Sequence, residues 1–299
     1  MTVNEPANKV IPLPRRGQPG GGEEPNRRRK SHARVIAITS GKGGVGKTNI
    51  VANLGYALSQ LGKKVIILDA DLGLGNLDVL LGVAPKFNIS HVIRGEKSLA
   101  EILEEGPGSM RILPAASGIQ ELTQLSHDQK MQVFTELDRL IDATDVLLID
   151  TAAGISSHVM DFNVMAHEII VVVSPEPTSI TDAYALMKVL SLKYAEKSCK
   201  LVVNQAASPK EAQDVFRQLD LVTDRFLDIH IDYLGCVLRD DKLTRSVKQQ
   251  RLVTDLYPES RASRCFTDLA KRVAKLAPTS RPKGNTNLFW HHLVRTTPV

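Results

Sequence analysis

Residues 35–48 read Val-Ile-Ala-Ile-Thr-Ser-Gly-Lys-Gly-Gly-Val-Gly-Lys-Thr. The apolar run 35–38 predicts a buried β-strand, and the amphipathic stretch from Lys47 predicts a helix directly after a glycine-rich turn. Backbone N–H groups of such a turn surround phosphates, the lysine reaches the β and γ oxygens, and the Thr48 hydroxyl suits Mg²⁺. A ligand-free turn would leave two lysines unexplained. The predicted nucleotide contacts are Gly41, Lys42, Gly43, Gly44, Val45, Gly46, Lys47 and Thr48.

Length and composition limit the possible classes of protein. The 299 residues, 42% of them hydrophobic, suffice for one large α/β domain or two small ones. No stretch approaches 18 apolar residues, and the N-terminus has no signal-peptide core, so we expect a cytoplasmic protein. The three cysteines lie far apart without metal-ligand spacing, which favours ordinary reduced core thiols at Cys199, Cys236 and Cys265.

The chain alternates short β-rich runs with helical patterns from residue 35 onward, which is typical of βα units. Runs such as 171–173 are apolar throughout and predict strands buried on both faces. The fold class expected is therefore α/β, a single domain with a doubly wound, mostly parallel sheet and helices on both faces. Strands are expected at 35–39, 65–69, 110–114, 146–150, 169–174, 200–204 and 233–237, and helices near 47–61, 90–104, 128–143, 178–194, 209–226 and 259–276.

Charge divides the chain into three parts. Residues 1–34 hold eight Lys/Arg and three Asp/Glu. Residues 278–299 hold three Lys/Arg and no Asp/Glu, and the remaining residues hold 27 Lys/Arg and 30 Asp/Glu. We expect a disordered basic Pro/Gly-rich tail over 1–33, a P-loop nucleotide-binding domain over 34–277, and a linker with an amphipathic segment over 278–299. The tails favour a polyanionic partner, either an anionic membrane or nucleic acid, although a basic run can also serve only solubility.

The C-terminal segment places Phe289, Trp290, Leu293 and Val294 on one side of a helical projection, with no acid nearby. Such a segment suits a lipid interface, and burial of its apolar side chains at roughly 25 cal/mol per Å² would contribute several kcal/mol. The other interpretation is packing on the domain or on a partner subunit.

Acids follow two of the predicted strands. Residues 146–149 are apolar and run into Asp150, a Walker B pattern in which Asp150 would hold Mg²⁺ through a water while Thr48 binds it directly. Gly154 then marks a switch able to sense the γ-phosphate. Asp69 and Asp71 end another β run, which places them beside the phosphates in an open α/β sheet.

The motif GKGGVGKT at 41–48 resembles the deviant Walker A motif of the MinD/ParA family of P-loop ATPases, and the resemblance covers nearly all of 35–277. It implies a slow regulatory ATP hydrolase that forms a homodimer with ATP. Lys42 would reach the nucleotide of the other subunit, and Asp71 would position the attacking water. The catalytic residues implied are thus Asp71, Lys42 and Lys47.

The residues at the end of the strand expected over 200–204 indicate whether the nucleotide carries adenine or guanine. The chain has Asn204-Gln205-Ala206-Ala207 where related GTPases carry Asn-Lys-x-Asp, so the expected cofactors are ATP and Mg²⁺. The family resemblance implies that Asn204 contacts adenine. The family's GxxP pattern is replaced here by residues 235–238, Gly-Cys-Val-Leu, which departs from its usual adenine pocket wall.

Within the family, the LGLGNLD stretch at 72–78, the block at 204–212 and the basic tails look most like the FlhG group, also called FleN or YlxH. This resemblance implies spatial and numerical control of flagella at the inner face of the cell membrane, with FlhF, a transcriptional activator or C-ring proteins as partners. The DQAxxLR element that stimulates FlhF is absent from 1–34.

Three alternatives remain open at this stage. The chain could be a division-site ATPase resembling MinD, a partition ATPase resembling ParA, or a transcriptional anti-activator that uses ATP as a switch. The near-neutral core argues against the DNA binding that a ParA-like role requires.

Overall fold

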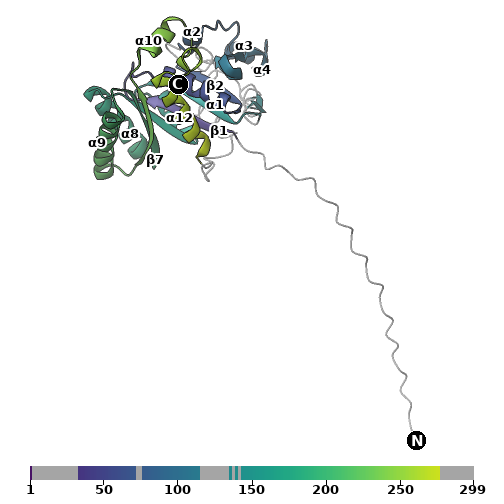
Figure 1. Cartoon of the computed structure of the whole chain (residues 1–299). Helices are drawn as coiled ribbons and strands as arrows, with labels where there is room; N and C mark the ends of the chain where they lie inside the picture. The colour runs from purple at the N-terminus through teal and green to yellow at the C-terminus, as the bar shows by residue number, and fades with distance from the viewer. Residues whose placement is uncertain (2–32, 72–75, 115–134, 137–138, 141–142, 277–299) are drawn as a thin grey trace. The chain divides into compact units, whose positions relative to one another are not determined.

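The structure is a computed structural model, and it describes Met1 and residues 33–71, 76–114, 135–136, 139–140 and 143–276. Eight strands form one sheet in the order β3-β4-β2-β5-β1-β6-β7-β8 (Figure 1). All neighbours are parallel except β3 and β4. The strands are β1 (Arg34–Ser40), β2 (Val65–Ala70), β3 (Glu104–Glu105), β4 (Arg111–Pro114), β5 (Val146–Ala153), β6 (Glu168–Val173), β7 (Ser198–Ala206) and β8 (His230–Leu238).

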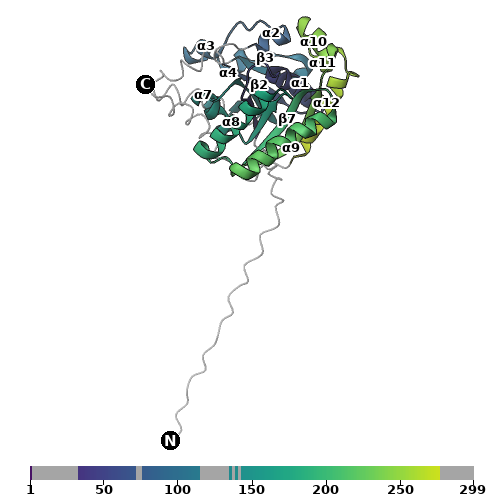
Figure 2. The same cartoon turned by 90° about the vertical axis from the view of Figure 1, so that its left-hand side faces the viewer.

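Helices cover both faces of this sheet (Figure 2). One face packs against α1 (Lys47–Gln60), α11 (Val253–Leu256) and α12 (Arg261–Lys275). The other packs against α3 (Ile89–Ile93), α4 (Leu99–Ile102), α7 (Ser157–Met165), α8 (Pro177–Tyr194) and α9 (Pro209–Phe226). The remaining described helices are α2 (Leu77–Leu81), α10 (Asp241–Lys248) and the 3₁₀ turn η1 (Pro107–Ser109).

Side chains of β1 alternate between the two faces of the sheet, which explains why helices pack on both. In β1, Ile36 and Ile38 face the core under α1, whereas Val35 and Ala37 face the opposite core. A strand between two cores needs apolar residues at every position. The expectation of a doubly wound, mostly parallel sheet is confirmed.

The helix expected over 90–104 is wrong. Gly95 has φ +72° and ends α3, and Ser98 begins α4 with a capping box to Glu101. The chain then becomes extended, so that Glu104 and Glu105 pair with β4. A run of helix-favouring residues was thus divided by one left-handed glycine and one cap.

The other long elements lie within a few residues of their predicted bounds. The helix expected over 128–143 lies largely outside the described residues, as do the tails 1–32 and 277–299. The short helices α2, α7, α10 and α11 were not predicted. No helix in the described ranges is both long and apolar enough to cross a bilayer. All three cysteines are free thiols, and burial raises the pKa of Cys199 to about 12.

Candidate nucleotide site

The phosphate loop, residues 41–46, lies where the direction of strand order reverses. It follows β1, which has β5 on one side and β6 on the other. Ligands of open α/β sheets bind at such a point, beyond the carboxyl ends of the strands. The Gly154 N–H at the end of β5 donates to the Ser40 carbonyl at 2.8 Å, so the predicted switch residue is joined to the start of the loop.

Two glycines of the loop leave no room for a side chain. A Cβ at Gly41 would overlap the backbone carbonyl of Asp182 in α8. Gly46 caps α1 with φ +86°, a left-handed conformation, and a Cβ there would overlap the Asn204 amide. The requirement for glycine at these two positions therefore comes from the fold as well as from the ligand.

Lys47 and Asp150 form a buried ion pair in the centre of the site. The lysine Nζ lies 2.6 Å from Asp150 Oδ1, with side-chain exposures of 8% and 2%. A cation at the first position of a helix opposes the helix dipole, so an anion is needed to hold it there. Burial raises the pKa of Asp150, and the ammonium together with a Thr48 hydrogen bond opposes that shift. The structure thus brings together the lysine and both residues predicted to hold the metal.

Two further carboxylates surround this pair. Asp69 lies opposite Asp150 in the β2–β5 register, and its Oδ1 accepts a 3.1 Å hydrogen bond from the Asp71 N–H. Burial, followed by the charge of Asp150, raises the pKa of Asp69 to about 7. Asp71 also acts electrostatically on both other acids. The Asp69 carboxylate thus holds the backbone of Asp71, the residue expected to position the attacking water.

The donor set suits Mg²⁺. The Thr48 hydroxyl and the Asp150 carboxylate are hard oxygen ligands, and Mg²⁺ commonly takes one or two protein ligands together with phosphate oxygens and water. Within the described residues there is no cluster of three His, Cys, Asp or Glu side chains arranged for a metal. A metal at this site would depend on the phosphates for most of its coordination.

Lys42 lies apart from that centre. Its Nζ donates to Glu176 Oε2 and to Thr178 Oγ1, each at 2.8 Å, at the start of α8. The lysine and glutamate are partly exposed, and this hydrogen bond lowers the pKa of Glu176. Sequence reasoning missed both partners. The available signal was the Pro175-Glu176-Pro177-Thr178 turn after β6, the strand that borders β1.

Asn204, near the carboxyl end of β7, contacts the loop. It is 3% exposed, and its Nδ2 donates to the Val45 carbonyl at 2.7 Å. The next residue, Gln205, has φ +60°, at a register shift between β7 and β8. This left-handed residue turns the strand end toward the loop. Leu238, where the family's proline pattern is missing, ends β8 opposite Ala206.

Known proteins share this arrangement and the sequence that builds it. The AAA domain family matches residues 33–203. Antiactivator FleN of Pseudomonas aeruginosa is 44% identical over 261 residues, covering 87% of this chain and 93% of that protein. The chain belongs to the MinD/ParA family of P-loop ATPases.

Two other members extend the comparison. Flagellum site-determining protein YlxH of Helicobacter pylori is 33% identical over 270 residues, covering 89% of this chain and 91% of that protein. Septum site-determining protein MinD of Pyrococcus horikoshii, solved with Mg-ADP, has a TM-score of 0.63 at 27% identity and covers 81% of this chain and 96% of that chain. The chain is accordingly a nucleotide-binding ATP hydrolase with the MinD/ParA fold.

Proposed function

We propose that this ATPase is an ATP-dependent switch that dimerises and controls the number and placement of flagella. One observation carries the proposal. Lys47 and Thr48 both contact the buried Asp150, and Asp71 acts electrostatically on that carboxylate, while Lys42 makes partly exposed contacts with other residues. Such a site can grip the nucleotide within one subunit and still offer a second ammonium to another.

Nucleotide binding would rearrange the central ion pair. The Lys47 ammonium would exchange Asp150 for the β and γ phosphates, and Thr48 and Asp150 would hold Mg²⁺. The metal would neutralise charge that develops on the phosphates. Asp71 would orient the attacking water, and the Oδ1 atom of Asn204 would accept from the adenine amino group. Gly41, Gly43, Gly44, Val45 and Gly46 would present their backbone to the phosphates.

Dimerisation would require Lys42 to leave its own subunit's Glu176 and Thr178. Both of these contacts are at the surface, where ion pairs contribute little and are readily exchanged. Val79 and Ile155 are each 53% exposed, and they follow the ends of β2 and β5 that carry the acids of the site. These exposed apolar side chains, which follow both acid-bearing strands in the sequence, would be available for contact with a second copy of the chain.

The flagellar role rests on the likeness to FleN and YlxH over nearly the whole domain. We take the partners to be FlhF, a flagellar transcriptional activator or C-ring proteins, with reversible attachment to the inner face of the cell membrane through residues 285–299. The name of FleN favours a second candidate, an anti-activator whose ATP-bound dimer blocks a transcriptional activator. Retained repression by Asp71→Ala would favour this candidate over a role that needs repeated hydrolysis.

The test of this proposal is a variant that binds ATP but cannot hydrolyse it, so that the protein stays in the ATP-bound state. Asp71→Ala should bind ATP with Mg²⁺ and remain a dimer by light scattering, because the water is no longer positioned for attack. Lys47→Ala is the matched control, in which binding and dimer should both be lost. A monomeric Asp71→Ala protein that binds ATP normally would contradict the proposal.

A further inference from the structure

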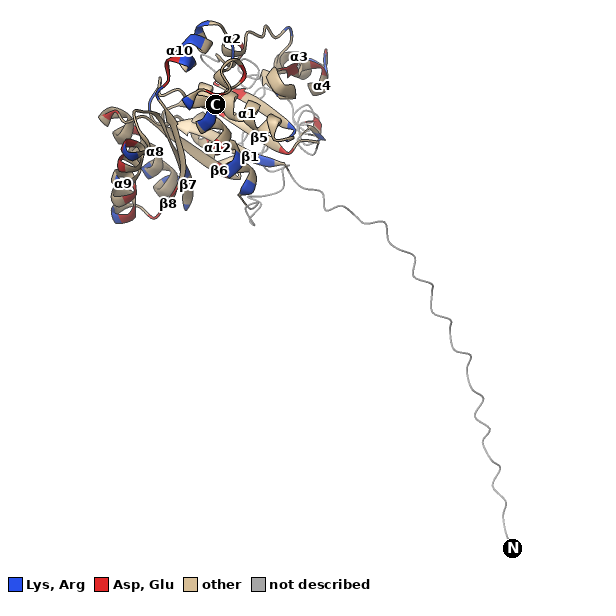
Figure 3. Ribbon diagram, viewed as in Figure 1, with Lys and Arg blue, Asp and Glu red and all other residues tan. Residues whose placement is uncertain are grey.

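Unpaired positive charge gathers at helix α10 and at the residue before its cap (Figure 3). The neighbouring acid Asp240 is occupied elsewhere, because its carboxylate accepts from the N–H groups of Lys242 and Ala262. Asp241 is the one acid within the helix. Four cations, which we call the α10 basic surface, are exposed and form no ion pair with a described residue: Arg239, Lys242, Arg245 and Lys248.

The packing of α10 turns these cations outward. Leu243 and Val247 pack against the core that α1 covers, and Ser246 between them is buried. The three cations within the helix recur at every third residue, so each step rises about 4.5 Å along the helix axis. The Lys242 ammonium lies 5.6 Å from the centre of the Tyr257 ring, and this contact holds it at the surface. The α10 basic surface is therefore a short row of cations on a well-packed helix.

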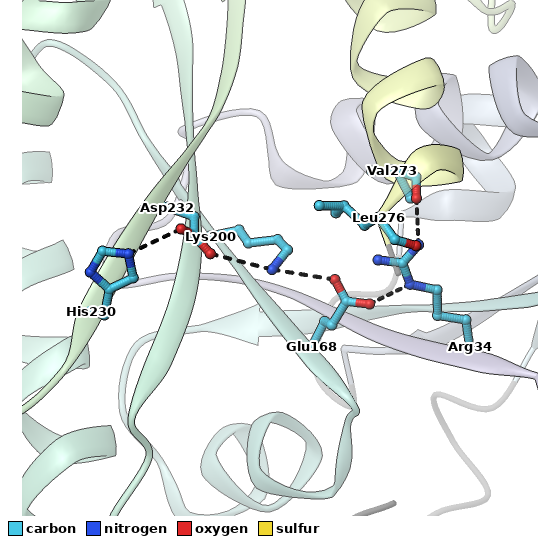
Figure 4. Close-up of polar contacts among 7 residues, drawn as sticks. All are labelled: Arg34, Glu168, Lys200, His230, Asp232, Val273 and Leu276. Atoms are coloured by element: carbon cyan, nitrogen blue, oxygen red, sulfur yellow. Dashed lines mark hydrogen bonds and ion pairs between the residues drawn. The ribbon is translucent and has the colours of Figure 1, made fainter. Parts of the chain in front are cut away.

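Cations at the opposite edge of the sheet are paired within the chain (Figure 4). Arg34 pairs with Glu168, and Lys200 Nζ lies 3.5 Å from the other oxygen of that glutamate. This charge row continues to Asp232 and His230, and it stands at the amino ends of β1, β6, β7 and β8. In contrast, α10 follows the carboxyl end of β8, at the edge that carries the phosphate loop. The described acids thus neutralise the cations of the charge row and leave those of the α10 basic surface without an ion pair.

Helix α10 is also in contact with the segment that follows Asp71. Helix α2 begins six residues after Asp71, and Gly82 ends it in a left-handed conformation with φ +64°. A Cβ on Gly82 would lie only 3.3 Å from the carbonyl oxygen of Gln250, which is two residues beyond the end of α10. Because closely packed backbones transmit displacements, a movement of α2 would reach the α10 basic surface.

We propose that the α10 basic surface binds an acidic segment of a partner protein, and that the bound nucleotide changes the affinity. The dependence on nucleotide rests on the proposed ATP switch, whereas the surface itself does not. Carboxylates three or four residues apart on a partner helix have the same one-turn spacing as the cations of α10. Such a segment would supply the negative charge that the chain itself does not place on this helix.

Nucleic acid fits this surface less well than an acidic polypeptide. The eight residues of α10 span about 12 Å, whereas a DNA-binding module buries at least roughly 600 Å² of protein surface. Residues 35–277 hold 27 Lys/Arg and 30 Asp/Glu, so phosphates beyond the α10 basic surface would meet net negative charge. A short acidic segment meets only the charges within a Debye length of about 10 Å.

The experiment measures the anisotropy of a fluorescein-labelled peptide, Ala-Glu-Glu-Ala repeated four times, titrated with full-length protein and Mg-ATP. Lys242→Gln/Arg245→Gln/Lys248→Gln should raise the dissociation constant about tenfold, because three exposed ion pairs are lost. The matched control, Lys188→Gln/Lys193→Gln/Lys210→Gln, removes equal charge from exposed positions of α8 and α9 and should raise it less than about twofold. Exchange of ATP for ADP should change the wild-type constant at least about fivefold.

The outcomes separate the surface from the switch. Wild-type affinity in the α10 variant, or equal weakening in the control, would overturn the docking surface. Equal wild-type affinity with ATP and with ADP would overturn its dependence on the nucleotide. An α10 variant that loses binding to a DNA duplex but keeps the peptide would assign the surface to nucleic acid instead. Light scattering of the same samples tests the ATP switch separately, since a wild-type protein that stays monomeric with ATP contradicts that switch whatever the peptide does.

Discussion

The carboxylates of the nucleotide site differ in how well their contacts stabilise a buried negative charge. Burial raises the pKa of Asp150, and the Lys47 ammonium at 2.6 Å and the Thr48 hydroxyl donor oppose this shift without cancelling it. Asp69 has backbone donors but lies beside Asp150, and its pKa is raised to about 7. When the pKa of a carboxyl is higher in the folded than in the unfolded protein, its contribution to folding stability is fully present only at a pH below the unfolded pKa. This benefit is lost as the pH rises through about 7.

The pH dependence of stability tests this assignment. Asp69→Asn keeps an oxygen that accepts from the Asp71 N–H and removes the buried charge. The variant should be more stable than the wild type at pH 8, by up to about 4 kcal/mol from a shift of about three pKa units, and equal to it near pH 4. Urea unfolding at both pH values measures the difference.

The control for this prediction is Asp224→Asn at an exposed position of α9. It should change the free energy of unfolding by less than about 0.5 kcal/mol at either pH. If Asp69→Asn is destabilising at pH 8, the carboxylate is needed in its charged form by the ligand-free fold, and the proposed cost of burial is wrong.

At the scale of elements, the charge row at the amino ends of the strands joins parts that are distant in sequence. Glu168 stands between Arg34 and Lys200, and Arg34 also caps the last turn of α12. Glu168→Ala would leave two largely buried cations without their shared partner. We expect a loss of about 3 kcal/mol in the free energy of unfolding, measured by urea denaturation.

Lys197→Ala serves as the comparison, because the Lys197–Asp228 pair joins the segments that lead into β7 and β8, but both side chains are more than half exposed. Its loss should be below about 1 kcal/mol. Equal effects of the two substitutions would show that the burial of Glu168 does not distinguish its ion pairs from a surface pair.

Sequence patterns predicted the elements whose causes are local. Strands β1, β2, β5 and β6 contain unbroken apolar runs, and α8 and α9 lie within one residue of their predicted bounds, each with a proline at its first position. The division of 90–104 was missed because it depends on the conformation of Gly95 and on pairing with β4. Glu176 was missed as a partner of Lys42 because 134 residues separate them and only the β1–β6 pairing brings them together.

The whole molecule is expected to exist in two states, and the Lys42 contacts bias the equilibrium between them. Glu176→Gln removes the ion pair that holds Lys42 against its own subunit, so the affinity of the ATP-bound subunits for each other should increase. A surface pair is worth about 0.2–1 kcal/mol, and two such pairs are released in each dimer, so the dimer dissociation constant should change by about twofold to thirtyfold. Analytical ultracentrifugation with ATP and Asp71→Ala in the background gives the measurement.

Lys42→Ala is the counterpart of this variant. It should bind nucleotide through Lys47 and Thr48 but fail to dimerise, because the bridging ammonium is gone. If Glu176→Gln weakens the dimer, then Glu176 itself belongs to the dimer interface and does not merely restrain Lys42.

The close approach of Gly41 to α8 has a mechanical consequence. Its Cα faces the Asp182 carbonyl with no space for even one methyl group between them. Two backbones in such contact cannot slide past each other as flexible side chains would allow. A tilt of α8 must therefore be transmitted to the loop, and a tightening of the loop must pull on α8. A protein bound to the outer surface of α8 would then respond to the nucleotide in the site, because Gly41 has no side chain to separate the loop from this helix.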